Sequence, residues 1–166
     1  MTHFTIAHEF DAEPEQFWKL FFDDAYNVAL YARLDMKERT VLVRTEDDAT
    51  IHFEQKILPR RDLPQIIKRL VGGDLGYIER TTYYKGKNYM DVAIEPTLFK
   101  DRTDVRAKYT IALVAPKKVR RTFEGDIHVD IPIIGRRVEA AVLVDVKRSY
   151  DVAAEVTREW LNHAAR

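Results

Sequence analysis

One carboxylate in this sequence is predicted to face the protein interior. Gly86-Lys87 separates two alternating apolar runs and predicts a two-residue hairpin loop. The resulting cross-strand pairs are Tyr83 with Met90, Thr81 with Val92 and Glu79 with Ile94. Because residues directly opposite each other share a face, Glu79 points inward, where a carboxylate is costly unless it is compensated. Glu79 has either a structural partner, such as Arg39 or a water, or a role as ligand anchor or acid/base group. A three-residue loop would turn it outward.

Aromatic side chains with polar tips accompany this carboxylate. Tyr83, Tyr109 and Tyr150 fall on inward-facing stripes, which suits an amphipathic ligand and equally suits a packed core. Together with Glu79 they favour a cavity with convergent polar groups. The ligand-binding set predicted from the inward faces is Phe53, Glu79, Tyr83, Tyr109, Ile111, Phe123, Ile127, Val146 and Tyr150.

Motifs of nucleophilic and phosphate chemistry are absent, so no catalytic residue is predicted. Ser149 is the sole serine and falls inside a predicted long helix, whereas a serine hydrolase needs an exposed elbow such as G-x-S-x-G. The glycine-rich stretch 72–76 is not followed by Lys-Ser/Thr. It therefore reads as a helix end and a turn, not as a phosphate loop.

The histidines predict no metal site. They are dispersed at positions 3, 8, 52, 128 and 163, without an H-E-x-x-H motif. His52 with Glu54, and His128 with Asp130, lie on the solvent side of strands that are not neighbours in a meander. His8 shares a face with apolar residues and is interpreted as a satisfied histidine of the core or cavity wall. Neither a metal nor another cofactor is predicted.

Composition excludes further classes of function. The 166 residues include no cysteine, which removes disulfides, thiolate nucleophiles and zinc fingers. Lys and Arg number 27 against 27 Asp and Glu, and this balance disfavours nucleic acid as a partner. The sequence shows neither a signal peptide nor an apolar run of about 18 residues. We expect a cytoplasmic protein with one domain over residues 1–166.

The elements that must position these residues follow from the periodicity. Residues 3–10 alternate as a strand, and two short helices follow near 14–21 and 25–34. Six further strands are predicted near 40–45, 51–57, 76–85, 88–95, 105–113 and 123–131. Residues 136–165 lack Gly and Pro and carry an apolar stripe at helical spacing, which predicts one long amphipathic helix.

This order resembles the START-like, or SRPBCC, superfamily with its Bet v 1-like helix-grip fold. The stretches similar to a bacterial branch of unassigned role are 8–10 (His-Glu-Phe), 14–18 (Pro-Glu-Gln-Phe-Trp), 21–24 (Phe-Phe-Asp-Asp), 72–77 (Gly-Gly-Asp-Leu-Gly-Tyr) and 131–135 (Ile-Pro-Ile-Ile-Gly). The resemblance implies an α+β fold, in which a curved seven-stranded antiparallel sheet wraps around a long C-terminal helix. The superfamily includes lipid carriers, plant hormone binders, polyketide cyclases and aromatase-type enzymes, so a ligand cavity is implied.

A gate to that cavity is predicted at one end of the sheet. Residues 63–70 form a short amphipathic helix beside the turn at 132–135. The predicted gate residues are Leu63, Ile66, Ile67, Leu70, Ile133 and Ile134. Lys68 and Arg69 then point outward, and basic plus apolar surface is typical of a transient membrane contact. A lid packed on its own domain is an equal alternative.

The register of the second strand depends on the length of one loop. Val41 and Val43 are expected to face inward with Ile51 and Phe53, which needs an odd-length loop after residue 46.

The function predicted first is non-catalytic binding or transport of a hydrophobic ligand, a lipid or polycyclic compound. A small polyketide cyclase or aromatase-type enzyme using the same cavity is the alternative, and a partner-binding domain with a vestigial cavity is the third.

Overall fold

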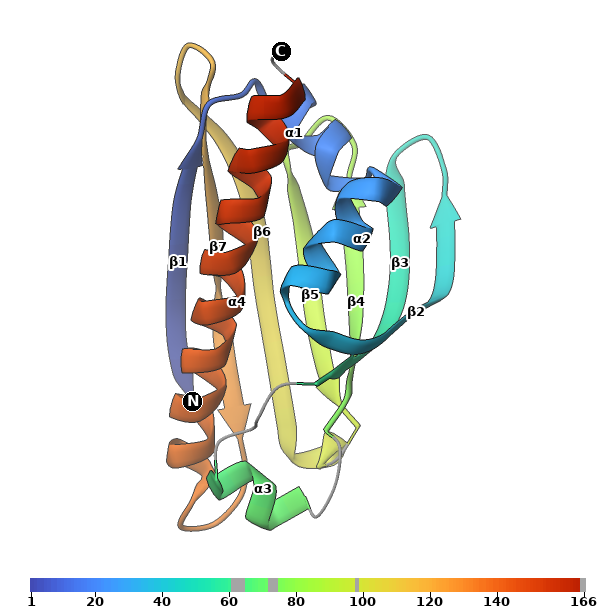
Figure 1. The fold of residues 1–166 in the computed structure, drawn as a ribbon. Coiled ribbons are helices and arrows are strands. Elements are labelled where there is room, and N and C mark those ends of the chain that lie inside the picture. Colours follow the sequence, from blue (N-terminus) through green and yellow to red (C-terminus); the bar gives the residue numbers. More distant parts are fainter. Residues whose placement is uncertain (61–64, 72–74, 98, 165–166) are drawn as a thin grey trace.

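The computed structural model describes residues 1–60, 65–71, 75–97 and 99–164, which form a seven-stranded antiparallel sheet with helices on one face (Figure 1). In chain order the elements are β1 (Thr2–Phe10), α1 (Pro14–Phe21), α2 (Asp24–Arg33), β2 (Met36–Glu46), β3 (Thr50–Pro59), α3 (Gln65–Val71), β4 (Tyr77–Tyr84), β5 (Tyr89–Pro96), a 3-10 turn (Lys100–Arg102), β6 (Thr103–Ala115), β7 (Lys118–Val129) and α4 (Gly135–Ala164). The strand order is β1-β7-β6-β5-β4-β3-β2.

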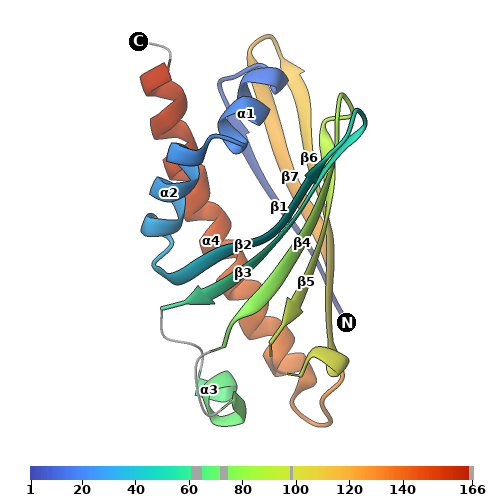
Figure 2. The same cartoon turned by 90° about the vertical axis from the view of Figure 1, so that its right-hand side faces the viewer.

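The sheet is curved, and α4 lies along its concave face together with α1 and α2 (Figure 2). This arrangement confirms the α+β helix-grip prediction, including the two short helices after the first strand. The helix predicted at 136–165 is continuous over Gly135–Ala164, and residue 165 lies outside the described residues. Its apolar side packs on strands with alternating buried residues, such as β7, where Val119, Phe123 and Ile127 are buried.

Local sequence signals fix α2 against α4, which forms one wall of the site. Asp23 caps α2, because its Oδ1 accepts a hydrogen bond from the Tyr26 backbone N–H at 2.8 Å. The Thr157 hydroxyl donates a hydrogen bond to the Ala153 carbonyl (2.7 Å) and therefore accepts one from the Tyr26 hydroxyl (2.8 Å). This buried bond joins the two helices and holds α2 away from the sheet edge.

The β4–β5 hairpin has the predicted register. Tyr83 opposes Met90, Thr81 opposes Val92 and Glu79 opposes Ile94. The connection is a four-residue turn over residues 85–88, not a two-residue loop, and it has the same parity. Gly86 (φ +75°) and Asn88 (φ 55°) both adopt the left-handed conformation that such a turn requires. Glu79 consequently faces inward.

Of the two β2 residues predicted to face inward, Val41 does so and Val43 does not. Glu46 opposes Ile51 and Arg44 opposes Phe53, so the loop has even length and not the odd length expected. A bulge between Val41 and Val43 then shifts the register. Val41 opposes Gln55 and faces inward as predicted, whereas Val43 opposes Glu54 on the outer face. The extra residue of the bulge, which periodicity does not reveal, causes the difference.

Candidate functional site

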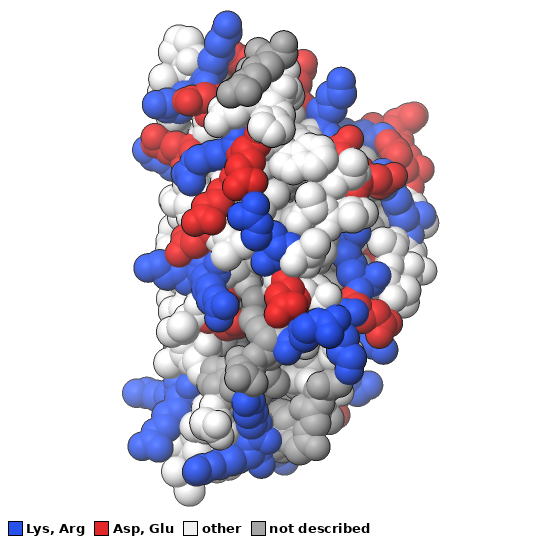
Figure 3. Space-filling view, viewed as in Figure 1, with Lys and Arg blue, Asp and Glu red and all other residues white. Residues whose placement is uncertain are grey.

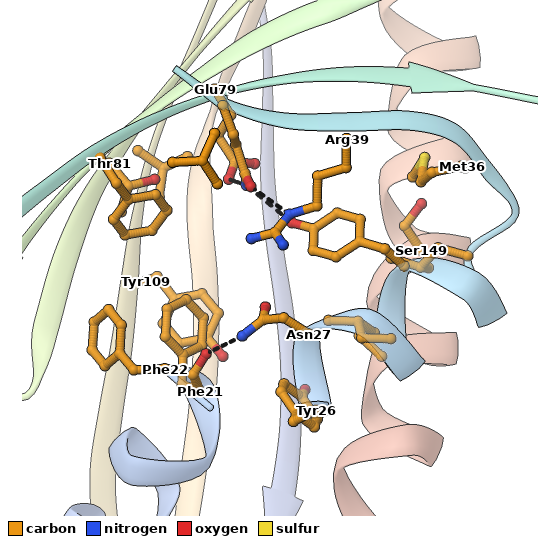
Figure 4. Close-up of a pocket in the computed structure, with 18 of the residues that line it drawn as sticks. Phe21, Phe22, Tyr26, Asn27, Met36, Arg39, Glu79, Thr81, Tyr109 and Ser149 are labelled. Carbon is orange, nitrogen blue, oxygen red and sulfur yellow. Dashed lines mark hydrogen bonds between the residues drawn. The ribbon is translucent and has the colours of Figure 1, made fainter. Parts of the chain in front are cut away.

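A cavity of about 210 Å³ lies between α2, the concave face of the sheet and the middle of α4. Figure 4 shows its lining residues, which α1, α2, the strands β2 to β7 and α4 all contribute. Aromatic rings of Phe53, Tyr109 and Tyr150 form part of its wall, and Thr81 and Ala153 add smaller side chains. The lining therefore combines aromatic and aliphatic side chains with several polar and charged ones.

The exposed lining residues show where this cavity opens. Arg39, Val41 and Arg44 on β2 and Asp24 at the start of α2 line the cavity and remain exposed. The other lining residues are buried or half-buried. The opening consequently lies between α2 and β2.

Glu79 belongs to a hydrogen-bonded cluster inside the cavity. Gln55, which is 2% exposed, donates from Nε2 to Glu79 Oε1 (2.7 Å) and to the Tyr31 hydroxyl (2.9 Å). Arg39 donates from Nε to Gln55 Oε1 (2.8 Å), and its guanidinium lies 4.3 Å from the centre of the Tyr31 ring. Arg39 and Glu79 point toward each other across the cavity (Figure 4). The direct partner of Glu79 is Gln55, with the charge of Arg39 close by.

Burial controls the protonation of this cluster. Loss of solvent raises the pKa of Glu79, and the Gln55 hydrogen bond and the Arg39 charge only partly oppose this effect. Burial, and then the nearby Glu79, also raises the pKa of Tyr31. Glu79 is thus a carboxyl group that releases its proton less readily than usual, which suits hydrogen bonding to a ligand or proton transfer.

A buried arginine forms the second polar feature of the cavity. Arg121 on β7 is 2% exposed and lines the cavity. One of its terminal nitrogens donates to His8 Nδ1 (2.8 Å) and to the Tyr150 carbonyl (2.9 Å). His8 Nε2 contacts Asp151 Oδ1 at 2.8 Å, so its proton sits on Nε2. Burial, and then the Arg121 charge, lower the pKa of His8, which keeps this ring neutral.

The predicted ligand-binding residues separate into two groups. Phe53, Glu79, Tyr109 and Tyr150 line the cavity. The other predicted residues pack in the core and do not line it: Tyr83, Ile111, Phe123, Ile127 and Val146. Two of these support the wall from behind, because Phe123 stacks on Tyr150 at 4.4 Å and Tyr83 packs against Phe22 at 5.2 Å.

The predicted gate does not coincide with the opening between α2 and β2. The helix predicted at 63–70 corresponds to α3, of which Ile66 packs against the core. Leu63 lies outside the described residues, as do the side chains of Ile67 and Leu70. Ile133 is fully exposed and Ile134 half-buried in the turn before α4. None of the gate residues whose side chains are described lines the cavity.

Two residues of the cavity were missed by the sequence analysis although the sequence carries a signal for them. Arg121 lies on the same face of β7 as Val119, Phe123 and Ile127. On β3, Gln55 lies between Phe53 and Ile57 on the inward face. A charged or amide residue within a buried alternating stripe indicates a polar group that the fold encloses. Gln55 and Arg121 are therefore predictable as enclosed polar groups by the same reasoning as Glu79.

Among the described residues, no group of three or more His, Asp or Glu side chains lies close enough together to hold a metal ion. His52 instead contacts Thr82 (3.1 Å) and Glu54 (3.4 Å) on the outer face of the sheet. Among the described helices, none has the length and apolar character that a membrane span requires.

Comparisons with known proteins place the fold. The chain superposes on the Thermus thermophilus protein TTHA0849 with a TM-score of 0.69, at 12% identity over 99% of this chain and 100% of that one. The Zhui aromatase/cyclase from a Streptomyces species gives 0.67, at 10% identity over 99% and 96%. A START superfamily protein from Mycobacterium smegmatis gives 0.59, at 16% identity over 96% and 98%. These likenesses show a START-like fold.

The sequence itself matches one family model. No curated protein matches the sequence. The model for a protein family of unknown function, DUF2505, covers residues 5–161, which include most of β1, all the other strands and nearly all of α4. The chain therefore belongs to the DUF2505 family, and it has the START-like helix-grip fold.

Proposed function

We propose that the protein binds a compact hydrophobic molecule, an aromatic or polycyclic compound, and catalyses no reaction on it. The observation that carries this proposal is the cavity between the sheet, α2 and α4, in which aromatic and aliphatic side chains surround a set of polar groups. Its volume of about 210 Å³ is smaller than the roughly 300 Å³ at which drug-sized sites begin. A compact ring system fits this space better than a lipid with two acyl chains.

The fold supports the proposal. Structures with the same fold include an aromatase/cyclase and a START superfamily protein. In this chain the long helix and the curved sheet leave a space that the core side chains do not fill. Entry takes place between α2 and β2, where the lining residues are exposed.

Native mass spectrometry of freshly purified protein tests whether a molecule is bound. The expected spectrum shows one additional mass per chain, which disappears on denaturation and is recovered by organic extraction. Binding of the neutral probe N-phenyl-1-naphthylamine, followed by its fluorescence, gives an affinity for the empty protein. Absence of both a co-purified molecule and probe binding would contradict the proposal.

A pair of α4 variants locates the binding site. Ala153 lines the cavity, whereas Ala140 on the same helix is exposed and does not. Ala153→Leu fills the cavity without changing helix propensity much, so we expect probe affinity to fall roughly tenfold or more. Ala140→Leu should leave probe affinity unchanged. Equal affinities of the two variants would place the binding site elsewhere.

The buried Glu79 favours a second candidate, a small cyclase of the aromatase type. Its raised pKa and its position in the cavity are those of a group that transfers protons to a bound chain. On this alternative, Glu79→Gln abolishes the cyclisation of a linear β-polyketone while probe binding persists. The binding proposal instead expects identical product mixtures with wild-type protein, with Glu79→Gln and without protein.

A further inference from the structure

Arg121 is a buried cation without a direct anionic partner. Its side chain is 2% exposed, and it forms no ion pair with any carboxylate among the described residues. Its Nε is buried and has no hydrogen-bond partner there. A guanidinium does not lose its proton in proteins, so this charge persists at every ordinary pH. A buried charge of this kind destabilises the fold unless something compensates it.

The contacts of Arg121 fix its position but leave it short of negative charge. The hydrogen bonds of its guanidinium go to neutral groups: the His8 ring at 2.8 Å, the Tyr150 carbonyl at 2.9 Å and the Tyr109 hydroxyl. Asp151 bonds to the other nitrogen of the His8 ring. The rings of Phe10 and Tyr150 lie 5.1 and 5.0 Å from its guanidinium carbon and form a rigid frame. The guanidinium is thus held in place with a free N–H.

The rest of the cavity also favours an anion. Burial raises the pKa of Tyr109 and of Tyr150, so both phenols keep their protons and act as donors. The charged residues that line the cavity are Arg39, Arg44 and Arg121 against Asp24 and Glu79. Of the two acids, Asp24 is exposed at the opening, while Glu79 is already bonded to Gln55. Among the described residues that line the cavity, therefore, no acid forms an ion pair with Arg121.

We propose that Arg121 binds the carboxylate of the ligand, and that the ligand is an aromatic or polycyclic carboxylic acid. This inference rests on the proposed function and names its class of ligand. A guanidinium donates paired N–H bonds to a carboxylate, and the surrounding rings pack against an aromatic body. A phosphate carries close to two charges, which would require more than one buried cation, and Arg121 is the only arginine of the cavity that is buried among the described residues.

Two isosteric probes test this inference by calorimetry: naphthalene-2-carboxylate and its neutral amide, naphthalene-2-carboxamide. Wild-type protein should bind the carboxylate roughly tenfold more tightly than the amide. Arg121→Met should bind the two probes equally. Arg120→Met is the matched control, because Arg120 is the next residue on β7, points outward and pairs with Glu9 at 2.7 Å. It should retain the full preference for the carboxylate.

Nuclear magnetic resonance of the unaltered protein decides the question even if Arg121→Met does not fold. The Nε–Hε signal of Arg121 should move downfield on titration with the carboxylate and stay nearly unchanged with the amide. Arg121→Lys, which keeps the charge but loses the paired donors, should keep only part of the preference.

The outcomes separate this inference from the proposed function. If both probes bind equally and the Arg121 signal does not respond, the anion site is refuted, the Nε–H is satisfied by water alone, and the hydrophobic cavity stands. Loss of the preference in Arg120→Met would also refute it, because a general charge effect would then explain the result. If neither naphthalene probe nor N-phenyl-1-naphthylamine binds and no molecule co-purifies, both proposals fail.

Discussion

At the scale of single residues, Glu79 couples stability to pH. Its side chain is half-buried in the cavity, and one neutral donor, Gln55, holds its carboxyl group at 2.7 Å. Burial raises its pKa in the folded state above the ordinary value of 4.5. Between these two values the folded protein holds a proton that the unfolded chain has lost. The free energy of unfolding therefore falls as pH rises through this window.

Replacing this group should remove the effect. We expect Glu79→Gln to be more stable than wild-type protein at pH 7.5, with a difference that shrinks as pH falls toward 4.5. Urea unfolding of both proteins across this range measures the difference directly. Glu155→Gln on the exposed side of α4 serves as the control. A difference independent of pH would show that Glu79 is ionised equally in the folded and unfolded states.

At the scale of elements, β6 and β7 approach each other so closely that a side chain is excluded at one position. A Cβ on Gly125 would lie 2.6 Å from the Ala107 Cβ and would meet the Arg106 carbonyl. The backbone cannot yield as a flexible side chain would. A glycine inside a strand often marks such a close approach of another backbone.

A pair of glycine variants measures the cost of this approach. Gly125→Ala should lower the free energy of unfolding by about 3 kcal/mol, the upper range for overpacking. Gly86→Ala meets no atom within 4 Å and suffers only from its positive φ, so its cost should be about 1 kcal/mol. Chemical denaturation gives both values. Similar costs for the two variants would argue that the strands separate easily.

The end of the sheet that carries α3 has an exposed basic surface. Lys and Arg gather there over α3 and the start of α4 (Figure 3), and Lys68, Arg69, Arg136 and Arg137 are all exposed. We expect this end to bind anionic vesicles in preference to neutral ones, at about 1 kcal/mol per charge near the surface. High salt should abolish the preference.

Charge reversal on α3 tests the membrane contact. Lys68→Glu combined with Arg69→Glu should abolish co-sedimentation with phosphatidylserine vesicles. The matched control reverses Lys87 and Lys117, which are exposed in turns at the opposite end of the sheet. If the α3 variant sediments like wild-type protein, this surface does not contact membranes. Ligand binding in the cavity would be unaffected, because neither Lys68 nor Arg69 lines it.

At the scale of the whole molecule, periodicity predicted the order of the strands and helices, and the resemblance to the START-like superfamily supplied their helix-grip arrangement. The alternation of β7 and the uninterrupted apolar stripe of α4 determine which faces meet, because only one arrangement buries both. The inward direction of Glu79 followed from turn parity alone. Turn parity failed at β2, where the bulge between Val41 and Val43 inserts a residue that no pattern in the sequence marks.

The position of the cavity was beyond sequence reasoning for a different reason. It depends on how α2 sits on α4 through the hydrogen bond of Tyr26 with Thr157, a contact 131 residues apart in the chain. Periodicity assigns Tyr83 and Ile127 to the inward face, but only packing decides that they are covered by Trp18 and the helices. Inward-facing residues are therefore predictable, and the subset that reaches a ligand is not.

The hydrogen bonds from Asp151 through His8 to Arg121 connect the molecular surface with the cavity. Ligand binding at Arg121 and protonation of His8 therefore depend on each other. The charged groups that act on His8 are Arg121 from β7 and Asp151 and Arg158 from α4. Because Arg121 lowers the pKa of His8, an anion that neutralises Arg121 must raise it. Binding of naphthalene-2-carboxylate then takes up part of a proton from solution, and by reciprocity it tightens as the pH falls below about 6.5.

Calorimetry in buffers of different ionisation enthalpy counts the protons taken up on binding. His8→Gln should abolish most of this uptake, whereas Glu79→Gln should retain the part that belongs to His8. An uptake unchanged in His8→Gln would show that the surface and the cavity are electrostatically independent. If the uptake follows His8, the acidity of the surrounding solution sets how firmly this protein holds its ligand, and an acidic compartment or membrane surface would load it while a neutral one would release it.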